Sequence, residues 1–246
     1  MPRQARKLSE SGYLHVIQRG IGKQLLFETP EDYKYYLRLL ECRSREKEVA
    51  VCTYCLMENH THLLLFDKKG KITELMKTIG ISYSYYFNQK YERVGHLFQD
   101  RYRSEPVESD TSLMRVTRYI LNNPMKAGIC PAKEYPWSSY HYFGDRSSFV
   151  DWSIMESLAG DKNAFAAFIE EKNDDVYLEY DSGCRHDDKW AIEVIHRRLE
   201  GRSGTSLQAM NRVERDKMIR LLKAEGLSVR QLERLTGINR GVIQKA

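Results

Sequence analysis

Residues 49–66 read VAVCTYCLMENHTHLLLF, and this stretch decides the fold. Its two parts, residues 49–57 and 62–66, are rich in β-forming side chains and contain neither glycine nor proline. They predict two strands of a hairpin, or one interrupted strand, with Glu58 and Asn59 at the point of interruption.

The segments around this stretch predict one more strand and several helices. Residues 13–27 mix β-forming side chains with a glycine-containing turn, which indicates a strand followed by a loop. Thr29 as N-cap and Pro30 at the first helical position begin a helix. Apolar residues at helical spacing in residues 72–91 and 111–122 predict two more helices. This alternation predicts an α+β sandwich with the helices on one face of a sheet.

The composition argues against a largely disordered chain and against a membrane protein. The 246 residues are 41% hydrophobic and 30% charged, which is enough apolar material for a core. No apolar run approaches the roughly 20 residues of a membrane-spanning helix, so we expect no membrane partner. The first ten residues are polar and basic, unlike a secretory signal, and the five cysteines are an odd number. We therefore expect a cytoplasmic protein without disulfides.

Charge divides the chain into three parts. Residues 1–144 carry 22 basic and 16 acidic side chains, residues 145–190 carry 5 and 12, and residues 191–246 carry 12 and 6. Two basic segments flanking an acidic one favour two anion-binding surfaces, although a scatter of surface lysines gives the same totals. The predicted organisation is a domain over residues 1–145, an acidic connector over residues 146–189 with some helix around residues 164–171, and a helical domain over residues 190–246.

The C-terminal segment has the outline of a helix-turn-helix. A helix is expected over residues 214–224, and Ser228 caps a short helix over residues 229–235. Gly237 then permits a tight turn, and Asn239 caps a last helix. The outline predicts a small all-α helix-turn-helix domain that binds duplex DNA, and a helical dimerisation or packing domain is the alternative.

Two short motifs carry side chains suited to chemistry. His60 and His62 lie two residues apart on a strand, so both imidazoles point to one face and could bind one divalent metal ion. Tyr119 and Asn123 lie four apart on a helix and therefore share a face, where the tyrosine hydroxyl could act as a nucleophile. Taken singly, each motif also fits an ordinary structural role: two solvent-facing histidines, or a half-buried tyrosine.

Together with their surroundings, these motifs resemble the single-tyrosine HUH-type transposases, most closely the REP-associated tyrosine transposase family within the IS200-like group. The resemblance covers about residues 10–144. Five sequence blocks carry it in the same order: HVIQRG at 15–20, MENHTHLLL at 57–65, GHLFQDRY at 95–102, YILNNPMKAG at 119–128 and YPWSSY at 135–140.

The resemblance implies a fold, a reaction and a set of residues. The fold would be ferredoxin-like, with an antiparallel sheet. His60, His62 and Asn123 would bind Mg²⁺ or Mn²⁺, and Tyr119 would be the nucleophile. The substrate would be single-stranded DNA near a hairpin, cut through a covalent 5′-phosphotyrosine link and joined by the reverse step, in DNA transposition. Enzymes of this type include monomers and homodimers.

The chain departs from the family pattern at two positions. Thr61 stands where a hydrophobic residue is usual, but its β-branched side chain suits a strand. Glu58 stands where we would expect a proline. Its carboxylate could support the metal site or could face solvent, and we favour solvent.

Other basic and polar residues are candidates for contacts with DNA. The C-terminal segment resembles, more loosely, the DNA-binding helix-turn-helix domain of bacterial replication initiators. In the first domain the candidates are Arg3, Arg6, Lys7, Arg101, Arg103 and Arg115. In the C-terminal domain they are Arg230, Arg234, Asn239, Arg240, Gln244 and Lys245.

The function predicted from these features is a tyrosine transposase, a metal-dependent endonuclease and strand transferase for single-stranded DNA. Within the same class, a replication or conjugation initiator is a rival. In another class, a non-catalytic DNA-binding regulator derived from a transposase is the alternative. The presence of His60, His62, Tyr119 and Asn123 together argues for the enzyme.

Overall fold

The computed structural model describes residues 9–172, 177 and 188–246. The chain divides into two compact units, Met1–Tyr180 and Asp181–Ala246. No helix in the described part of the chain has the length and apolar character needed to cross a membrane.

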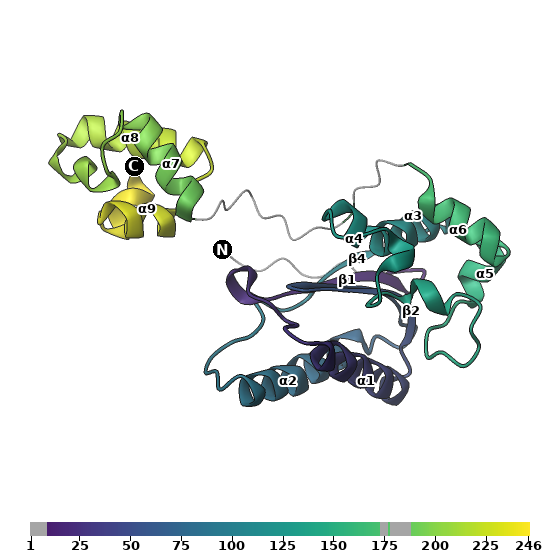
Figure 1. The fold of residues 1–246 in the computed structure, drawn as a ribbon. Helices are drawn as coiled ribbons and strands as arrows, with labels where there is room; N and C mark the ends of the chain where they lie inside the picture. Colours follow the sequence, from purple (N-terminus) through teal and green to yellow (C-terminus); the bar gives the residue numbers. More distant parts are fainter. Residues whose placement is uncertain (1–8, 173–176, 178–187) are drawn as a thin grey trace. The chain divides into compact units, whose positions relative to one another are not determined.

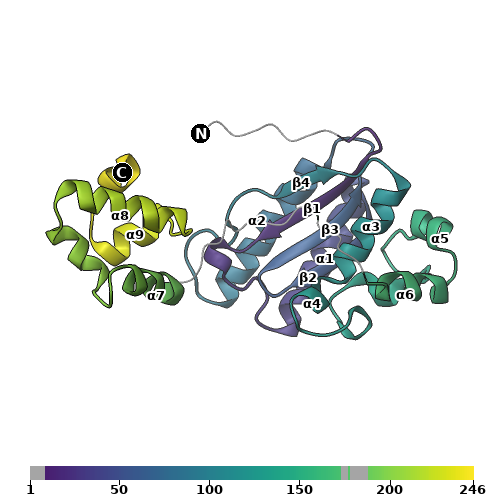
Figure 2. The same ribbon diagram turned by 90° about the horizontal axis from the view of Figure 1, so that it is seen from above.

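The first unit is built on a four-stranded antiparallel sheet with the strand order β2-β3-β1-β4 (Figures 1 and 2). The elements follow one another as β1 (Tyr13–Arg19), α1 (Pro30–Lys47), β2 (Ala50–Met57), β3 (His60–Phe66), α2 (Ile72–Lys90) and β4 (Arg103–Pro106). This βαββαβ succession is the ferredoxin-like motif. The predicted α+β class is confirmed, and the stretch at residues 49–66 forms the β2–β3 hairpin.

Helices cover both faces of the sheet. Figure 1 shows α1 and α2 against one face, while α3 (Asp110–Leu121) and α4 (Asn123–Lys126) lie on the other. The two helices of the βαββαβ unit share a face, as predicted. Both α3 and α4 follow that unit and cover the other face, so the expectation that the helices occupy one face is corrected.

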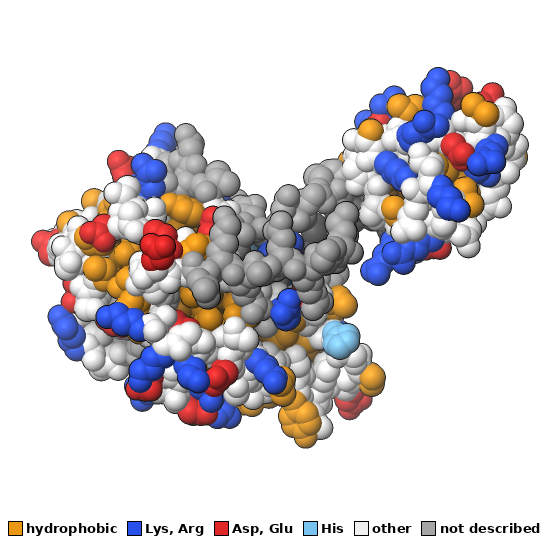
Figure 3. All heavy atoms as spheres, turned by 180° about the vertical axis from the view of Figure 1, so that it is seen from behind, with side chains coloured by type: hydrophobic (Ala, Val, Ile, Leu, Met, Phe, Trp, Pro, Cys, Tyr) orange, Lys and Arg blue, Asp and Glu red, His pale blue; other side chains and the backbone are white. Residues whose placement is uncertain are grey.

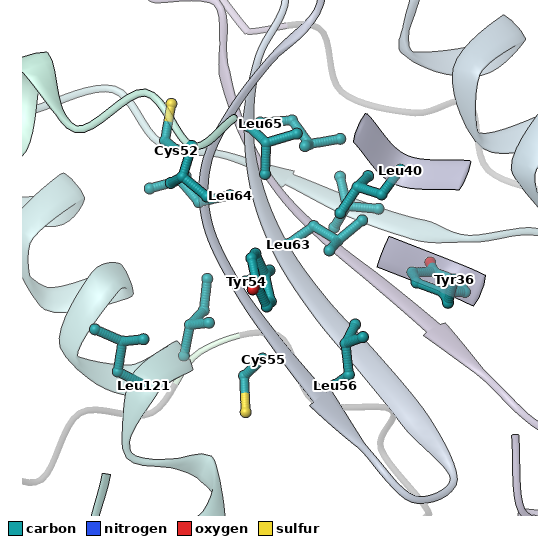
Figure 4. Close-up of a cluster of buried hydrophobic side chains, with 14 of the residues drawn as sticks. Tyr36, Leu40, Cys52, Tyr54, Cys55, Leu56, Leu63, Leu64, Leu65 and Leu121 are labelled. Carbon is teal, nitrogen blue, oxygen red and sulfur yellow. The ribbon is translucent and has the colours of Figure 1, made fainter. Parts of the chain in front are cut away.

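The core has a layer on each side of the sheet. Tyr36 and Leu40 of α1 face the strand residues Leu56 and Leu63, and all four side chains are fully buried (Figure 4). On the opposite side, Leu121 of α3 packs toward the same strands. Full burial of a leucine side chain contributes about 1.5–3 kcal/mol, so both layers stabilise the sheet that carries the histidines.

Much of the predicted connector is folded. Residues 153–170 form α5 (Ser153–Ala159) and α6 (Lys162–Glu170), and the Phe143 and Phe165 rings stack at 3.9 Å. The Asn122 amide nitrogen donates to the Ile169 carbonyl oxygen at 2.7 Å. The first domain therefore extends beyond residue 145, because the acidic composition of this segment masks its buried apolar positions.

The remaining elements are short 3₁₀ helices and the second unit. The 3₁₀ helices of the first unit are η1 (Ile21–Lys23), η2 (Ala132–Glu134) and η3 (Ser139–Tyr142). The second unit contains α7 (Asp188–Arg198), η4 (Gly204–Ala209), α8 (Arg212–Ala224), α9 (Val229–Thr236) and α10 (Arg240–Lys245). Ser228 caps α9, and Gly237 follows it with a left-handed φ of 70°. These helices match the predicted helical segments.

The buried carboxylate of Asp32 links α1 to α2 through hydrogen bonds. Asp32, in the first turn of α1, accepts hydrogen bonds from the backbone N–H groups of Glu28 and Thr29 and from the side chains of Tyr86, Lys90 and Tyr91. Burial alone would raise the pKa of this carboxyl, but the hydrogen bonds from Lys90, Tyr91 and the backbone lower it to about 2.

We expect Asp32→Ala to destabilise the first unit by about 3 kcal/mol, because it leaves the Lys90 ammonium without its buried partner. In the wild-type protein the carboxylate contributes stability above its unfolded pKa of about 3.8, and this contribution is lost as the pH falls toward 2. Urea unfolding at pH 7 and pH 3 measures both effects. An equal loss of stability on mutation at the two pH values would contradict the assignment.

Candidate active site

The pairing of β1 with β3 gathers three histidines on one face of the sheet. Ile17 lies opposite His62, and His15 lies opposite Leu64, so the two imidazoles are diagonal neighbours across the ladder. The His15 Nε2 and His62 Nδ1 atoms are 3.0 Å apart, which is a hydrogen bond. His60 shares this face because it is two residues from His62.

All three imidazoles are neutral at neutral pH. Burial lowers the pKa of His15 to about 3. Burial lowers the pKa of His62 well below 6.5, with smaller effects from His60, His15 and Lys126. Burial and the nearby Arg19 guanidinium lower the pKa of His60 to about 4. Neutral imidazole is the form that binds metal ions, so the lone pairs needed for coordination are present.

The hydrogen bonds favour one tautomer of each candidate ligand. The His60 Nδ1 atom lies 2.6 Å from the Asn59 side-chain oxygen, which only accepts, so Nδ1 carries the proton and Nε2 carries the lone pair. If His62 Nδ1 donates to His15 in the same way, its Nε2 is also free to coordinate. Metal-binding histidines usually donate their second N–H to an acceptor in this manner.

This donor set fits a divalent ion that takes few protein ligands. The described residues contain no cluster of three or more His, Cys, Asp or Glu side chains arranged to hold a metal ion. Two imidazoles would therefore have to be joined by an amide oxygen, water or phosphate oxygens. Mg²⁺ is usually bound with several waters and substrate phosphates, and imidazole also suits transition metals.

Tyr119 of α3 lies over this face of the sheet. Its ring centroid is 5.7 Å from that of His62 and 5.9 Å from that of His15, both edge to face. The side chain is 1% exposed. Lys126 Nζ lies 4.3 Å from the ring centroid, and the ring of Tyr177 packs against it at 5.5 Å. The structure thus brings the predicted nucleophile beside the predicted metal ligands.

Asn123 lies at the junction of α3 and α4. Its amide nitrogen donates to the carbonyl oxygens of Tyr119 at 2.9 Å and Ile120 at 3.3 Å. The side chain is half-buried. Because the nitrogen faces the backbone of α3, the side-chain oxygen is the atom left for a ligand, and its role at a metal remains a prediction.

Four residues of the site were not assigned a role from sequence. His15 stands in the quoted block at residues 15–20, but only the strand register reveals its contact with His62. Lys126 follows Tyr119 by seven residues and Asn123 by three, a spacing that could have pointed to it. Arg19 lies opposite His60 in the ladder, and Tyr177 comes from a distant part of the sequence.

The two departures from the family pattern leave the site intact. Thr61 is fully buried on the face of the sheet opposite to His60 and His62. Glu58 is exposed in the β2–β3 turn, and its backbone carbonyl accepts hydrogen bonds from the N–H groups of Leu26 and Phe27. Its exposure agrees with the solvent-facing interpretation.

The candidate DNA-binding residues are surface residues where the structure describes them. Arg3, Arg6 and Lys7 lie outside the described residues. In the first unit, Arg101, Arg103 and Arg115 are exposed. In the second unit, the exposed candidates are Arg230, Arg234, Asn239, Arg240, Gln244 and Lys245. Asn239 also caps α10 by accepting from the Gly241 N–H at 2.8 Å.

Comparisons with known proteins agree with this geometry. Residues 9–123 match the family model described as IS200-like transposase. The structure is similar to a REP-associated tyrosine transposase solved with a bound REP hairpin, with a TM-score of 0.52 and 14% sequence identity. The alignment covers 63% of this chain and 96% of that chain, and the likeness shows a shared fold. No curated protein matches the sequence.

Replacing His15 with phenylalanine should flatten the pH dependence of stability. The folded pKa of about 3 lies below the unfolded value of about 6.5, so the unfolded state binds more protons between these values. Wild-type stability therefore falls as the pH drops below 6.5, and His15 accounts for about 2 kcal/mol of that fall by pH 5. Urea unfolding of the metal-free protein measures the slope.

The matched control is Ile17→Val, which removes one buried methyl group on the same strand face and no titrating group. It should lower stability at every pH while keeping the wild-type slope. Parallel curves for wild type and His15→Phe would contradict the burial of a neutral imidazole at this position.

Proposed function

We propose that the protein is a metal-dependent endonuclease and strand transferase for single-stranded DNA next to hairpins, because residues 9–123 match the IS200-like transposase family model. The observation that carries the proposal is the convergence of His60, His62 and Tyr119 on one face of the sheet. The similarly folded relative, a tyrosine transposase bound to a REP hairpin, supports a hairpin substrate.

Tyr119 is the proposed nucleophile. Its hydroxyl oxygen attacks the phosphorus atom, an O–P bond to the tyrosine forms, and the bond from phosphorus to the 3′ oxygen breaks. The products are a 5′-phosphotyrosine link and a free 3′-hydroxyl, and the tyrosine proton ends on that hydroxyl. A Mg²⁺ or Mn²⁺ ion bound by His60, His62 and Asn123 would polarise the phosphate. Rejoining is the reverse reaction, so no nucleotide cofactor is needed.

Two cations of this chain favour a phosphate at the site. Arg19 and Lys126 each act electrostatically on one of the two histidines, which places both charges near the imidazole pair. Lys126 also lies over the Tyr119 ring. Positive charges held next to a reacting phosphate stabilise the negative charge that develops on its oxygens and on the attacking oxygen.

Tyr119 is buried, so it must become exposed before it can react. A side chain that is 1% exposed cannot reach a phosphate until part of its cover moves. The ring of Tyr177, which contacts both Tyr119 and His15, is the aromatic neighbour that lies outside the βαββαβ unit. We propose that DNA displaces this ring when it enters the site.

The second unit is the proposed duplex-binding module. Residues 191–246 carry 12 basic and 6 acidic side chains, and Lys and Arg are visible over the face of this unit in Figure 3. The turn at Gly237 and the exposed α10 match the outline of a helix-turn-helix whose last helix meets DNA. Arg230 and Arg234 of α9 would hold phosphates, which position the protein without reading sequence.

The first test is cleavage of a labelled library of single-stranded hairpins in Mn²⁺. Wild-type protein should give a covalent protein–DNA adduct that resists denaturant, and Tyr119→Phe should give none because it lacks the attacking oxygen. Adding a chelator should also abolish the adduct. Denaturing gel electrophoresis of the labelled strand measures it.

Tyr85→Phe is the matched control, because Tyr85 is 68% exposed on α2, which covers the face of the sheet opposite to α3. It should form the adduct at the wild-type level. Tight hairpin binding by all three proteins, with no adduct from any of them, would replace the enzyme with the non-catalytic regulator.

Substitution of Arg240 or Lys245 with alanine should weaken binding to duplex DNA and reduce the salt slope by about one unit for each lost phosphate contact. Fluorescence anisotropy over a range of salt concentrations measures both quantities. Arg220→Ala, on α8 of the same unit, should leave the slope unchanged. An equal effect from all three substitutions would contradict a specific role for α10.

A further inference from the structure

A second site lies on the face of the sheet that the histidines do not use. A pocket of about 720 Å³ is lined by α2, by the end of β1 and by residues 95–102, the loop that leads into β4. This volume is within the range of about 300–1,000 Å³ found for small-molecule sites. Gln18 lines the pocket, whereas its neighbour Arg19 points to the face that carries His60.

The side of α2 that lines the pocket includes a glycine, Gly80, where a larger side chain would enter the pocket. Lys77, Gly80, Ile81 and Ser84 line the pocket from one side of the helix. A Cβ atom at Gly80 would come within 3.3 Å of the Gln18 amide nitrogen. Glycine in a helix interior lowers helix stability by about 1 kcal/mol relative to alanine. Gly80 therefore keeps this part of the pocket open at the expense of helix stability.

Gln18, which lines the pocket, carries a buried acceptor that lacks a donor. Gln18 is 4% exposed, and no hydrogen-bond partner for its side-chain oxygen occurs among the residues that the structure describes. Leaving such a group unsatisfied costs about 1–3 kcal/mol. A ligand that offers an N–H group to this oxygen would remove that cost.

The rest of the lining defines the ligand further. Phe98 and Tyr102 supply aromatic rings, and Ile81 at the rim is 61% exposed. Lys77 and Arg101 supply positive charge and Asp100 one negative charge, so the charged residues of the lining are net positive. A flat ring bearing an N–H group and attached to a phosphate chain satisfies all three features, and aromatic stacking with basic neighbours is how proteins hold single-stranded nucleic acid.

We infer that this pocket binds one unpaired nucleobase of the DNA strand, with the Gln18 oxygen accepting a hydrogen bond from an N–H group on the edge of the base. The inference rests on the proposed function, which supplies the DNA. It goes beyond that function by assigning a base-reading site to the opposite face of the sheet.

The test compares two single strands that differ only in their bases. Oligothymidylate dT12 and an abasic 12-mer of the same backbone are titrated against the full chain in EDTA, so that no cleavage occurs. Loss of one stacked base weakens binding roughly tenfold or more, so dT12 should bind at least that much tighter. Gly80→Leu, which fills the pocket, should reduce this ratio by roughly tenfold.

Thr78→Leu is the matched control, because it adds the same kind of side chain to α2 outside the pocket lining. It should keep the wild-type ratio. A third strand of N3-methylthymidine keeps the ring but lacks the N–H donor, and it should bind wild-type protein more weakly than dT12. This arm needs no mutant, so it decides the question even if Gly80→Leu does not fold.

The inference is overturned if N3-methylthymidine binds as tightly as dT12, or if a folded Gly80→Leu keeps the wild-type ratio. Failure of the proposed reaction gives a different result. Base-dependent binding through the pocket without a covalent adduct would retain this site and remove the Tyr119 chemistry. An adduct without base dependence would do the reverse.

Discussion

The register of the β1–β3 ladder is the constraint on which the site depends. It places Ile17 opposite His62 and Arg19 opposite His60, and the alternation of side chains then sends His15 to the same face. If one strand slipped by one residue relative to the other, its site residues would point to the face of the sheet that α1 and α2 cover. The buried leucines on both faces oppose such a slip, because it would expose or misplace each of them.

The site is polar but is built inside the core. His15 and His62 are almost fully buried and neutral, so their mutual hydrogen bond replaces the water that each imidazole loses. The same burial preserves the lone pairs that a metal ion requires. Burial of Tyr119 has the opposite consequence for function, since the nucleophile must be uncovered before it can react.

The sequence alone was enough to pair candidate site residues that lie two to four positions apart along the chain. His60 and His62 on one strand, and Tyr119 with Asn123 four residues later, could be paired without a structure, and residues 9–123 match the model of the IS200-like transposase family that these motifs resemble. The contact of His15 with His62 could not be found, because it joins residues 47 apart through strand register. The helix expected around residues 164–171 is present as α6, but α5 was missed and the segment was treated as a connector because its acidic composition outweighed the spacing of its apolar residues.

The position of a bound ion tests the central claim most directly. Crystals soaked in Mn²⁺ and measured at a wavelength where manganese scatters anomalously would show where the ion binds. The account predicts one peak between the Nε2 atoms of His60 and His62, on the side of Tyr119. Manganese bound only at other residues, or through the Nδ1 atoms that now hydrogen bond to Asn59 and His15, would contradict it.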